Sequence, residues 1–357
     1  MDKSFQNFVC MKRILLFISI FLLTFKSLAQ PITVDNTTYT VPQLVQDVLF
    51  SSGSLGSSCV GTISNISWST GSGASDGSSF GSSNGIGYFQ NTNPNFPLNS
   101  GVILSTGNAM NAPGPNTTTL GDGTNAWLGD NDLFNYINNL GIDPLLTDYN
   151  NATVLEFDFT PLTNQMSFDF LFASEEYGTF QCAYSDSFAF FLTNVTAGTP
   201  TTNLALLPST NTPISVVTIR DDANNANCAS ANPSFFGIYN GGANAANAAT
   251  NFNGETILMT ANTTVIPNNV YHIKLVIADR NDNSYDSAVF LGGGSFDIGT
   301  ASLAGIDEFD GLDDFTGPNA ICGSETLTIQ AGETSILGAT YEWTLEGSPI
   351  PGANTFT

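Results

Sequence analysis

The sequence predicts an all-β protein: an antiparallel β-sandwich, jelly-roll-like, with one or two short peripheral helices. Apolar residues alternate with polar ones in segments such as "VLEFDF" at 154–159 and "MSFDFLF" at 166–172, which is typical of strands with one buried face. The chain also contains 27 Phe and 34 Gly, a composition suited to many short strands separated by turns. We expect the phenylalanines to form the core between two sheets.

Residues 1–29 have the pattern of an export signal. Lys12 and Arg13 precede the apolar run 14–23, and "SLAQ" offers a small-residue cleavage site after Ala29. The run is too short to cross a bilayer, and no later segment reaches the roughly 18 consecutive apolar residues of a transmembrane helix. We therefore expect an exported chain with no transmembrane segment.

Two helices are expected outside the sheets. The segment 41–50, "VPQLVQDVLF", places apolar residues at helical spacing after a proline and predicts a short amphipathic helix over the edge of the sandwich. The segment 131–140, "NDLFNYINNL", predicts a second. Between them, residues 51–116 are rich in Gly, Ser, Asn and Thr, which predicts short strands joined by long loops.

The domain boundary is expected after Gly299. The sandwich would span 30–299, an acidic linker 300–320 would follow, and 321–357 would begin a second β domain. The motif "CGSETLTIQAG" followed by "ATYEWTLEGSPIPG" resembles the start of an immunoglobulin-like or PKD-like repeat. Such domains need roughly 80–100 residues, so we expect this one to be incomplete here and the protein to be anchored to the cell envelope by a region further on.

The charge of the chain excludes several partners. Four of the seven Lys and Arg residues lie in the leader, so residues 30–357 carry a formal charge of −27, from three basic and 30 acidic residues. Three cations cannot neutralise a run of phosphates, which argues against nucleic-acid binding and against attraction to an anionic membrane. Divalent cations are natural partners of such a surface; the alternative is that self-repulsion keeps the chain soluble.

The cysteines predict one disulfide. Exported proteins permit disulfides, and the four cysteines after the leader allow three full pairings. We favour Cys182 with Cys228, because both fall in loops of the same domain. Cys59 would then stay free or loosely paired, and Cys322 would pair further on.

Most catalytic chemistry is excluded by the residue types present. His272 is the only histidine, so a Ser-His-Asp triad and a histidine-based zinc site are both excluded. It shares a strand face with Lys274, which favours a structural, solvent-facing role. No CxxC spacing and no phosphate-binding glycine loop occurs in the required context. We therefore predict no catalytic residues and a protein that is not an enzyme.

One acidic segment partly matches a calcium loop. In "DRNDNSYD" at 279–286, Asp279, Asn281 and Asn283 fit the first three ligand positions of an EF-hand. Ser284 stands where that loop needs glycine, and Phe290 stands where it needs a bidentate glutamate. An EF-hand is therefore rejected, although oxygen-rich loops at the end of a sandwich can still bind Ca²⁺.

The second acidic segment is "FASEEYGTFQCAYSDSFAFF" at 172–191. If the two segments lie side by side, their carboxylates can form a Ca²⁺-dependent rim at one end of the sandwich. The alternative is a set of Asx-turns that cap the hairpins. The candidate metal ligands are Glu175, Glu176, Asp186, Asp279, Asp282 and Asp286.

The order of several motifs resembles a known family. "SGVILSTGNA", "FLFASEEYGTF", "SDSFAFFLT" and "VIADRNDNSYDSAVFLGGGSF" together resemble the choice-of-anchor L domain over about residues 41–299. The resemblance implies a bacterial exported protein that is secreted or displayed on the outer cell surface, often through a type IX sorting domain or further Ig-like repeats. It implies no enzymatic activity and no substrate.

These observations predict a non-enzymatic surface module that binds a surface glycan or a protein ligand, with a role in adhesion and with Ca²⁺ as a stabilising cofactor. One alternative is a carbohydrate-binding accessory module, for which Trp68, Tyr88 and Trp127 would be the ligand-facing aromatics. Another is a glycoside hydrolase that uses only two carboxylates.

Overall fold

The computed structural model describes residues 30–50, 62–71, 84–299, 339–345 and 348–355. The predicted signal peptide, the acidic linker 300–320, and Cys59 and Cys322 lie outside these residues. Two short strands near the C-terminus, β14 (Thr344–Leu345) and β15 (Ser348–Pro349), pair antiparallel. The immunoglobulin-like or PKD-like repeat stays a prediction.

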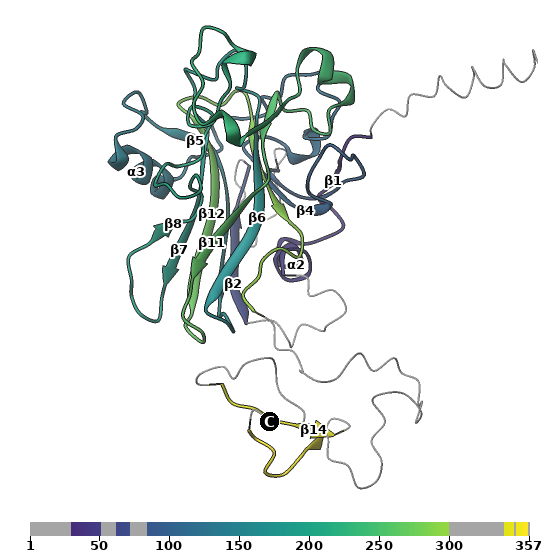
Figure 1. The fold of residues 1–357 in the computed structure, drawn as a ribbon, viewed down its shortest axis with the longest axis vertical. Coiled ribbons are helices and arrows are strands. Elements are labelled where there is room, and N and C mark those ends of the chain that lie inside the picture. Colours follow the sequence, from purple (N-terminus) through teal and green to yellow (C-terminus); the bar gives the residue numbers. More distant parts are fainter. Residues whose placement is uncertain (1–29, 51–61, 72–83, 300–338, 346–347, 356–357) are drawn as a thin grey trace, which may run out of the picture.

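Two antiparallel sheets pack face to face, which confirms the predicted all-β sandwich (Figure 1). The larger sheet consists, in spatial order, of β1 (Thr33–Asp35), β3 (Ile86–Gln90), β4 (Ser100–Ser105), β13 (Ser287–Gly292), β6 (Gln165–Ser174), β10 (Gly254–Thr256) and β9 (Phe236–Tyr239), with β11 (Met259–Thr264) also paired to β6. The smaller sheet consists of β2 (Ile63–Ser69), β5 (Tyr149–Phe159), β12 (Tyr271–Arg280), β7 (Ser187–Asn194) and β8 (Thr202–Asn203).

Helices lie outside the two sheets, as predicted. A single helical turn, α2 (Val41–Gln43), continues as the π-helix η1 (Leu44–Leu49), and α3 (Asn131–Leu140) has the predicted bounds. Thr40 and Gln43 form a reciprocal capping box at the start of α2. Short 3₁₀ turns occupy the connections: η3 (Ala109–Asn111), η4 (Asp222–Asn224), η5 (Pro233–Phe235) and η6 (Gly242–Asn247).

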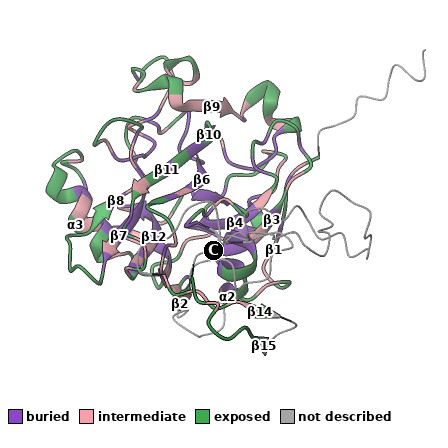
Figure 2. Cartoon of the chain, turned by 60° about the horizontal axis from the view of Figure 1, so that its bottom comes forward, coloured by how far each residue is buried: buried purple, intermediate pink, exposed green. Residues whose placement is uncertain are grey.

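The alternating phenylalanines form the core between the sheets. Phe168 of β6 stacks on Phe296 with ring centroids 4.2 Å apart and meets Phe190 of β7, from the other sheet, edge-on at 5.0 Å. Phe170 and Phe188 lie in the same layer, 5.7 Å apart. Buried residues line the strands, whereas exposed ones concentrate in the connecting loops (Figure 2). The prediction that these rings are core is therefore confirmed.

The segment 41–50 packs beside the two sheets, to the right of β6 and below β4 in Figure 1. Its apolar side chains belong to the main core cluster, and Phe50 contacts Phe157 and Phe296 at 5.6 and 5.2 Å. The backbone carbonyls of Val48 and Leu49 accept hydrogen bonds from Gly294 and Phe296. The first helical segment of the domain therefore packs against its last residues.

The phenylalanine layer predicts the largest single-residue losses of stability. Replacing Phe168 by Ala should lower the free energy of unfolding by about 3–5 kcal/mol, because it leaves a cavity between the two sheets. Chemical denaturation measures this change. Leu145→Ala serves as the control, since that side chain is 72% exposed, and the two variants should not have similar stabilities.

Candidate functional site

The two acidic segments meet at one end of the sandwich. Glu175 and Glu176 directly follow β6, and Asp286 directly precedes β13, the strand paired with β6. The backbone N–H of Glu175 donates a hydrogen bond to the carbonyl of Asp286 at 3.0 Å. The larger sheet therefore brings three of the predicted residues together.

The smaller sheet contributes two more carboxylates. Asp186 directly precedes β7, and Asp279 lies near the end of β12, its partner strand. The backbone N–H of Arg280 donates to Asp186 Oδ1 at 2.9 Å, and the hydroxyl of Ser287, from the larger sheet, donates to Asp186 Oδ2 at 2.7 Å. We call Glu175, Glu176, Asp186, Asp279 and Asp286 the acidic cluster.

The acidic cluster is buried where the strands end, so its carboxylates do not form an open rim. Its five side chains are at most 2% exposed. The physical reason is that the loop around residues 118–125, distant in sequence, packs over the strand ends. Asp282 differs from the cluster, since it is half-buried in the turn after β12 and accepts a hydrogen bond from the N–H of Ser284 at 2.9 Å.

Glu175 and Asp286 hold this covering loop. Glu175 Oε1 accepts the N–H of Leu120 at 3.0 Å, and both oxygens of Asp286 accept the N–H of Asp122 at 3.1 and 3.2 Å. Burial raises the pKa of both carboxyls to about 7. Gly107 is required beneath them, because a Cβ there would lie 1.7 Å from Asp286 Oδ2.

Two of the other three acids, Glu176 and Asp279, have unsatisfied oxygens. Among the described residues, neither oxygen of Asp279 and only one of Glu176 has a hydrogen bond of normal geometry, although Thr106 lies close enough to Asp279 to lower its pKa somewhat. Burial, followed by the charge of Asp186, raises the pKa of Glu176 and of Asp279 well above the usual range. Burial also raises the pKa of Asp186 to about 7.

The side chain of Arg280 is paired with a carboxylate outside the cluster, although its charge still opposes the rise in the pKa of Glu176. The guanidinium of Arg280, 5% exposed, binds both carboxylate oxygens of Asp143, with Nη2 to Oδ1 at 2.7 Å. Asp143 was not predicted as a site residue, because it lies in the turn after α3 and no motif marks it. The buried negative charge must therefore be neutralised by protons or by a cation from solution.

The arrangement limits which chemistry can occur here. In the part of the chain that the structure describes, no group of three or more His, Cys, Asp or Glu side chains is already arranged to hold a metal ion. The acidic cluster also lines neither of the two pockets considered below. A polysaccharide cannot reach these carboxylates in this conformation, which weakens the glycoside hydrolase alternative.

The aromatics predicted to face a ligand do not form one surface. Trp127 is 2% exposed, and its Nε1 donates to the carbonyl of Ala152 at 2.8 Å, so the prediction of a ligand-facing ring is wrong there. Trp68 on β2 and Tyr88 on β3 are half-buried against the core and belong to different sheets. The three rings therefore cannot stack on one ligand.

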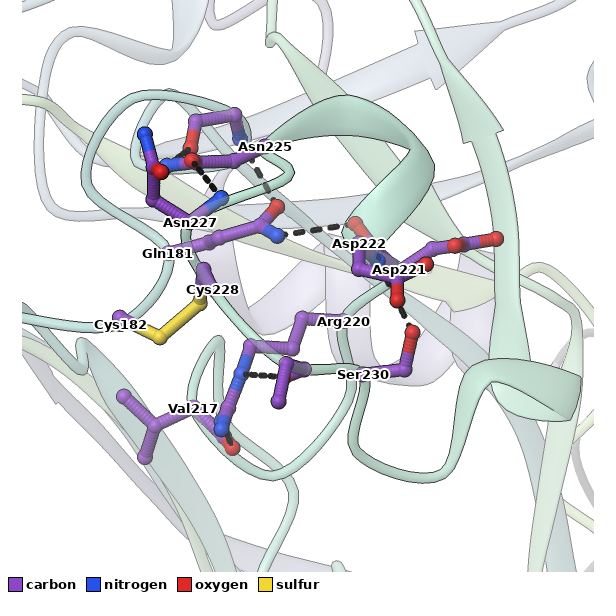
Figure 3. The surroundings of a disulfide bond; sticks show 12 residues. Gln181, Cys182, Val217, Arg220, Asp221, Asp222, Asn225, Asn227, Cys228 and Ser230 are labelled. Carbon is purple, nitrogen blue, oxygen red and sulfur yellow. Dashed lines mark hydrogen bonds between the residues drawn. A yellow bond between two sulfur atoms is a disulfide. The ribbon is translucent and has the colours of Figure 1, made fainter.

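The predicted disulfide is present. Cys182 and Cys228 are bonded, with Cα atoms 5.7 Å apart (Figure 3). Beside them, Gln181 Nε2 donates to the carbonyl of Asp221 at 2.8 Å, and Asn225 Nδ2 donates to the carbonyl of Gly178 at 2.8 Å. The disulfide and these hydrogen bonds fasten the segment that carries Glu175, Glu176 and Asp186 to a second loop.

The fold and the cluster together define an all-β sandwich module with a buried acidic end. A family model of the choice-of-anchor L domain matches residues 33–297, and the chain belongs to this family. No curated protein and no solved structure matches the chain significantly.

Family membership indicates an extracellular or surface-associated protein, and the family is not an enzyme family. None of the helices that the structure describes is long and apolar enough to cross a membrane.

The raised pKa of Glu175 predicts a pH dependence of stability. The folded-state pKa of about 7 exceeds the unfolded value. The protonated Glu175 carboxyl therefore contributes to folding stability fully below about pH 4.3, and this contribution is lost as pH rises through 7. In chelator-treated buffer, the free energy of unfolding should therefore fall between pH 5 and 8. Glu175→Gln should reduce this fall in the free energy of unfolding by roughly 1–3 kcal/mol. An identical slope in both proteins would contradict the assignment.

The disulfide predicts a measurable contribution to stability. Its cysteines are 46 residues apart, so replacing both by Ala should cost about 2–4 kcal/mol, chiefly by freeing the unfolded chain. Calorimetry of the variant, beside wild type with and without reductant, measures this loss. Reduced wild type should resemble the variant; a variant as stable as oxidised wild type would refute the prediction.

Proposed function

We propose that the protein is an exported, non-enzymatic surface module that binds a ligand and whose acidic cluster is neutralised by Ca²⁺. The observation that carries the proposal is the Asp279 carboxylate, which is 0% exposed, lies beside the Asp186 carboxyl and has no hydrogen bond of normal geometry to either oxygen among the described residues. An isolated buried carboxylate is strongly unfavourable unless it binds a proton or a cation.

Ca²⁺ suits the residues present. It takes six to eight oxygen ligands from carboxylates, backbone carbonyls and water in flexible geometry. Glu176, Asp186 and Asp279 would hold it, since these three acids act on one another electrostatically and include the unpartnered oxygens. Because the acids do not form a finished cage, water and small side-chain shifts would complete the coordination. The ion would supply charge neutralisation and no reaction step.

The neutralised cluster would support a ligand pocket. Glu175 and Asp286 accept hydrogen bonds from the N–H groups of Leu120 and Asp122. Leu120 and Asp122, together with Asn251 and neighbouring threonines, line an open polar cavity of about 410 Å³. Asn251 Oδ1 in turn accepts the N–H of Thr117 at 3.0 Å. Repulsion among unneutralised acids would disturb this loop, so cation binding and ligand binding would be linked.

The remaining features of the proposal concern cellular location. The leader-like residues 1–29 support export from a bacterial cell, and the segment after Gly299 supports anchoring to the cell envelope through a C-terminal region, with type IX secretion as one route. Adhesion to a surface glycan or protein is the role that such a display serves best.

Calcium should stabilise the protein at neutral pH. We expect the melting temperature of the mature chain in millimolar CaCl₂ to exceed that in EGTA by several degrees, since binding at tenfold the Kd adds about 1.4 kcal/mol and each kcal/mol is worth about 2–4 °C. Differential scanning calorimetry at constant ionic strength, with MgCl₂ as the comparison, measures the effect. No response to calcium would refute the cation site.

Variants separate this site from a general effect of charge. Asp279→Asn should abolish the calcium response and raise the melting temperature in EGTA, because the amide removes a buried charge while keeping the shape. Asp47→Asn is the matched control: Asp47 is exposed on η1, and its variant should keep the full response. Equal responses of both variants would contradict the assignment of Asp279.

A further inference from the structure

A second cavity, of about 350 Å³, lies on the outer face of the smaller sheet beside α3. Residues of β5 and β12 make its floor, and the residues next to them in sequence point into the core. Phe157 and Ile273 belong to the main core cluster, so Glu156, His272 and Lys274, at alternate positions, face outward. This cavity shares no lining residue with the acidic cluster, and its residues have no role in the proposed cation site.

The floor of the cavity is a fixed array of hydrogen-bond donors and acceptors. His272 Nδ1 lies 2.7 Å from Asp158 Oδ1, and its Nε2 lies 3.4 Å from Glu156 Oε2. Lys274 Nζ lies 2.6 Å from Asp132 of α3 and 2.7 Å from Asp130. Residues 30–357 include only three Lys and Arg, and one of these three, with the only histidine of the sequence, lies on this floor. Each side chain is held in place by its partners.

The walls add an aromatic ring and neutral polar groups. Tyr136 of α3 is half-buried and meets Phe191 edge-on with centroids 5.3 Å apart. Thr193 and Thr201 face each other with hydroxyl oxygens 2.7 Å apart. Asn203 is 7% exposed and also lines the cavity, and its Nδ2 has no hydrogen-bond partner among the described residues. A buried donor without a partner is unfavourable unless a bound molecule or water satisfies it.

We propose that this cavity binds a neutral sugar unit of a surface glycan. Sugar hydroxyls both donate and accept, which matches the mixture of carboxylate, ammonium, imidazole, hydroxyl and amide groups. The C–H face of a sugar ring carries partial positive charge, which the negative face of the Tyr136 ring attracts. The volume lies at the small end of ligand pockets, as a single sugar unit requires.

The charges of the cavity favour neutral over anionic ligands. Four carboxylates surround the floor, from Asp130, Asp132, Glu156 and Asp158, against the two basic groups of Lys274 and His272. Sulfated or sialylated glycans would add negative charge to an already acidic site. Trp68, Tyr88 and Trp127, which the sequence suggested as ligand-facing rings, do not line this cavity.

A glycan array of neutral, sulfated and sialylated oligosaccharides, probed with labelled mature chain, tests the proposal. We expect neutral glycans to bind, and the best of them is then titrated by calorimetry. Tyr136→Ala should weaken binding at least tenfold, equivalent to roughly 1.4 kcal/mol, whereas Tyr136→Phe should stay close to wild type because it keeps the ring. Tyr184→Ala is the matched control, because Tyr184 lies in the connection between β6 and β7 and does not line the cavity. Melting temperatures establish that each variant is folded.

The outcomes distinguish this proposal from the cation site. Binding that persists in EGTA supports an independent sugar site, even if calcium proves not to stabilise the protein. Binding of no glycan, binding of charged glycans alone, or equal binding by wild type and folded Tyr136→Ala would each overturn the proposal.

Discussion

The structure depends on aromatic packing between its two sheets. Rings from β6 and β7, on opposite sheets, interlock in one layer, as the 5.0 Å contacts of Phe190 with Phe168 and with Phe170 illustrate. This packing fixes how far each strand can slide, because a shift of one residue would turn every ring outward. It therefore also fixes where the strands end, and the residues just beyond those ends are forced to meet.

The acidic cluster follows from that constraint. Carboxylates placed after β6, before β7, near the end of β12 and before β13 converge because four strands end at one level. The chain has few cations to balance them, and Arg280, the nearest, is already bound to Asp143. The charge of the acidic cluster therefore depends on protons or cations supplied by the surrounding solution.

The sequence predicted those parts of the fold that rest on local periodicity. Alternation at 154–159 and 166–172 predicted two strands, and helical spacing predicted the helical segment 41–50. Placement in one domain predicted the Cys182–Cys228 disulfide. Burial of the acids was not predictable in this way, because Leu120 and Asp122, which cover them, lie 55 and 164 residues from their partners. Trp127 was misassigned for the same reason: its burial comes from contacts with β5, and no repeat in its own segment marks it as core.

The hydrogen bonds between the first helical segment and the last residues of the domain have a mechanical consequence. Gly294 and Phe296 are hydrogen-bonded to Val48 and Leu49, and Asp297 forms a backbone pair with Ser167 of β6. A pulling force applied beyond residue 299 would reach these bonds before any central strand. Several of them would share the load, so the module should resist tension from its C-terminal side as a unit rather than unravel from its last strand.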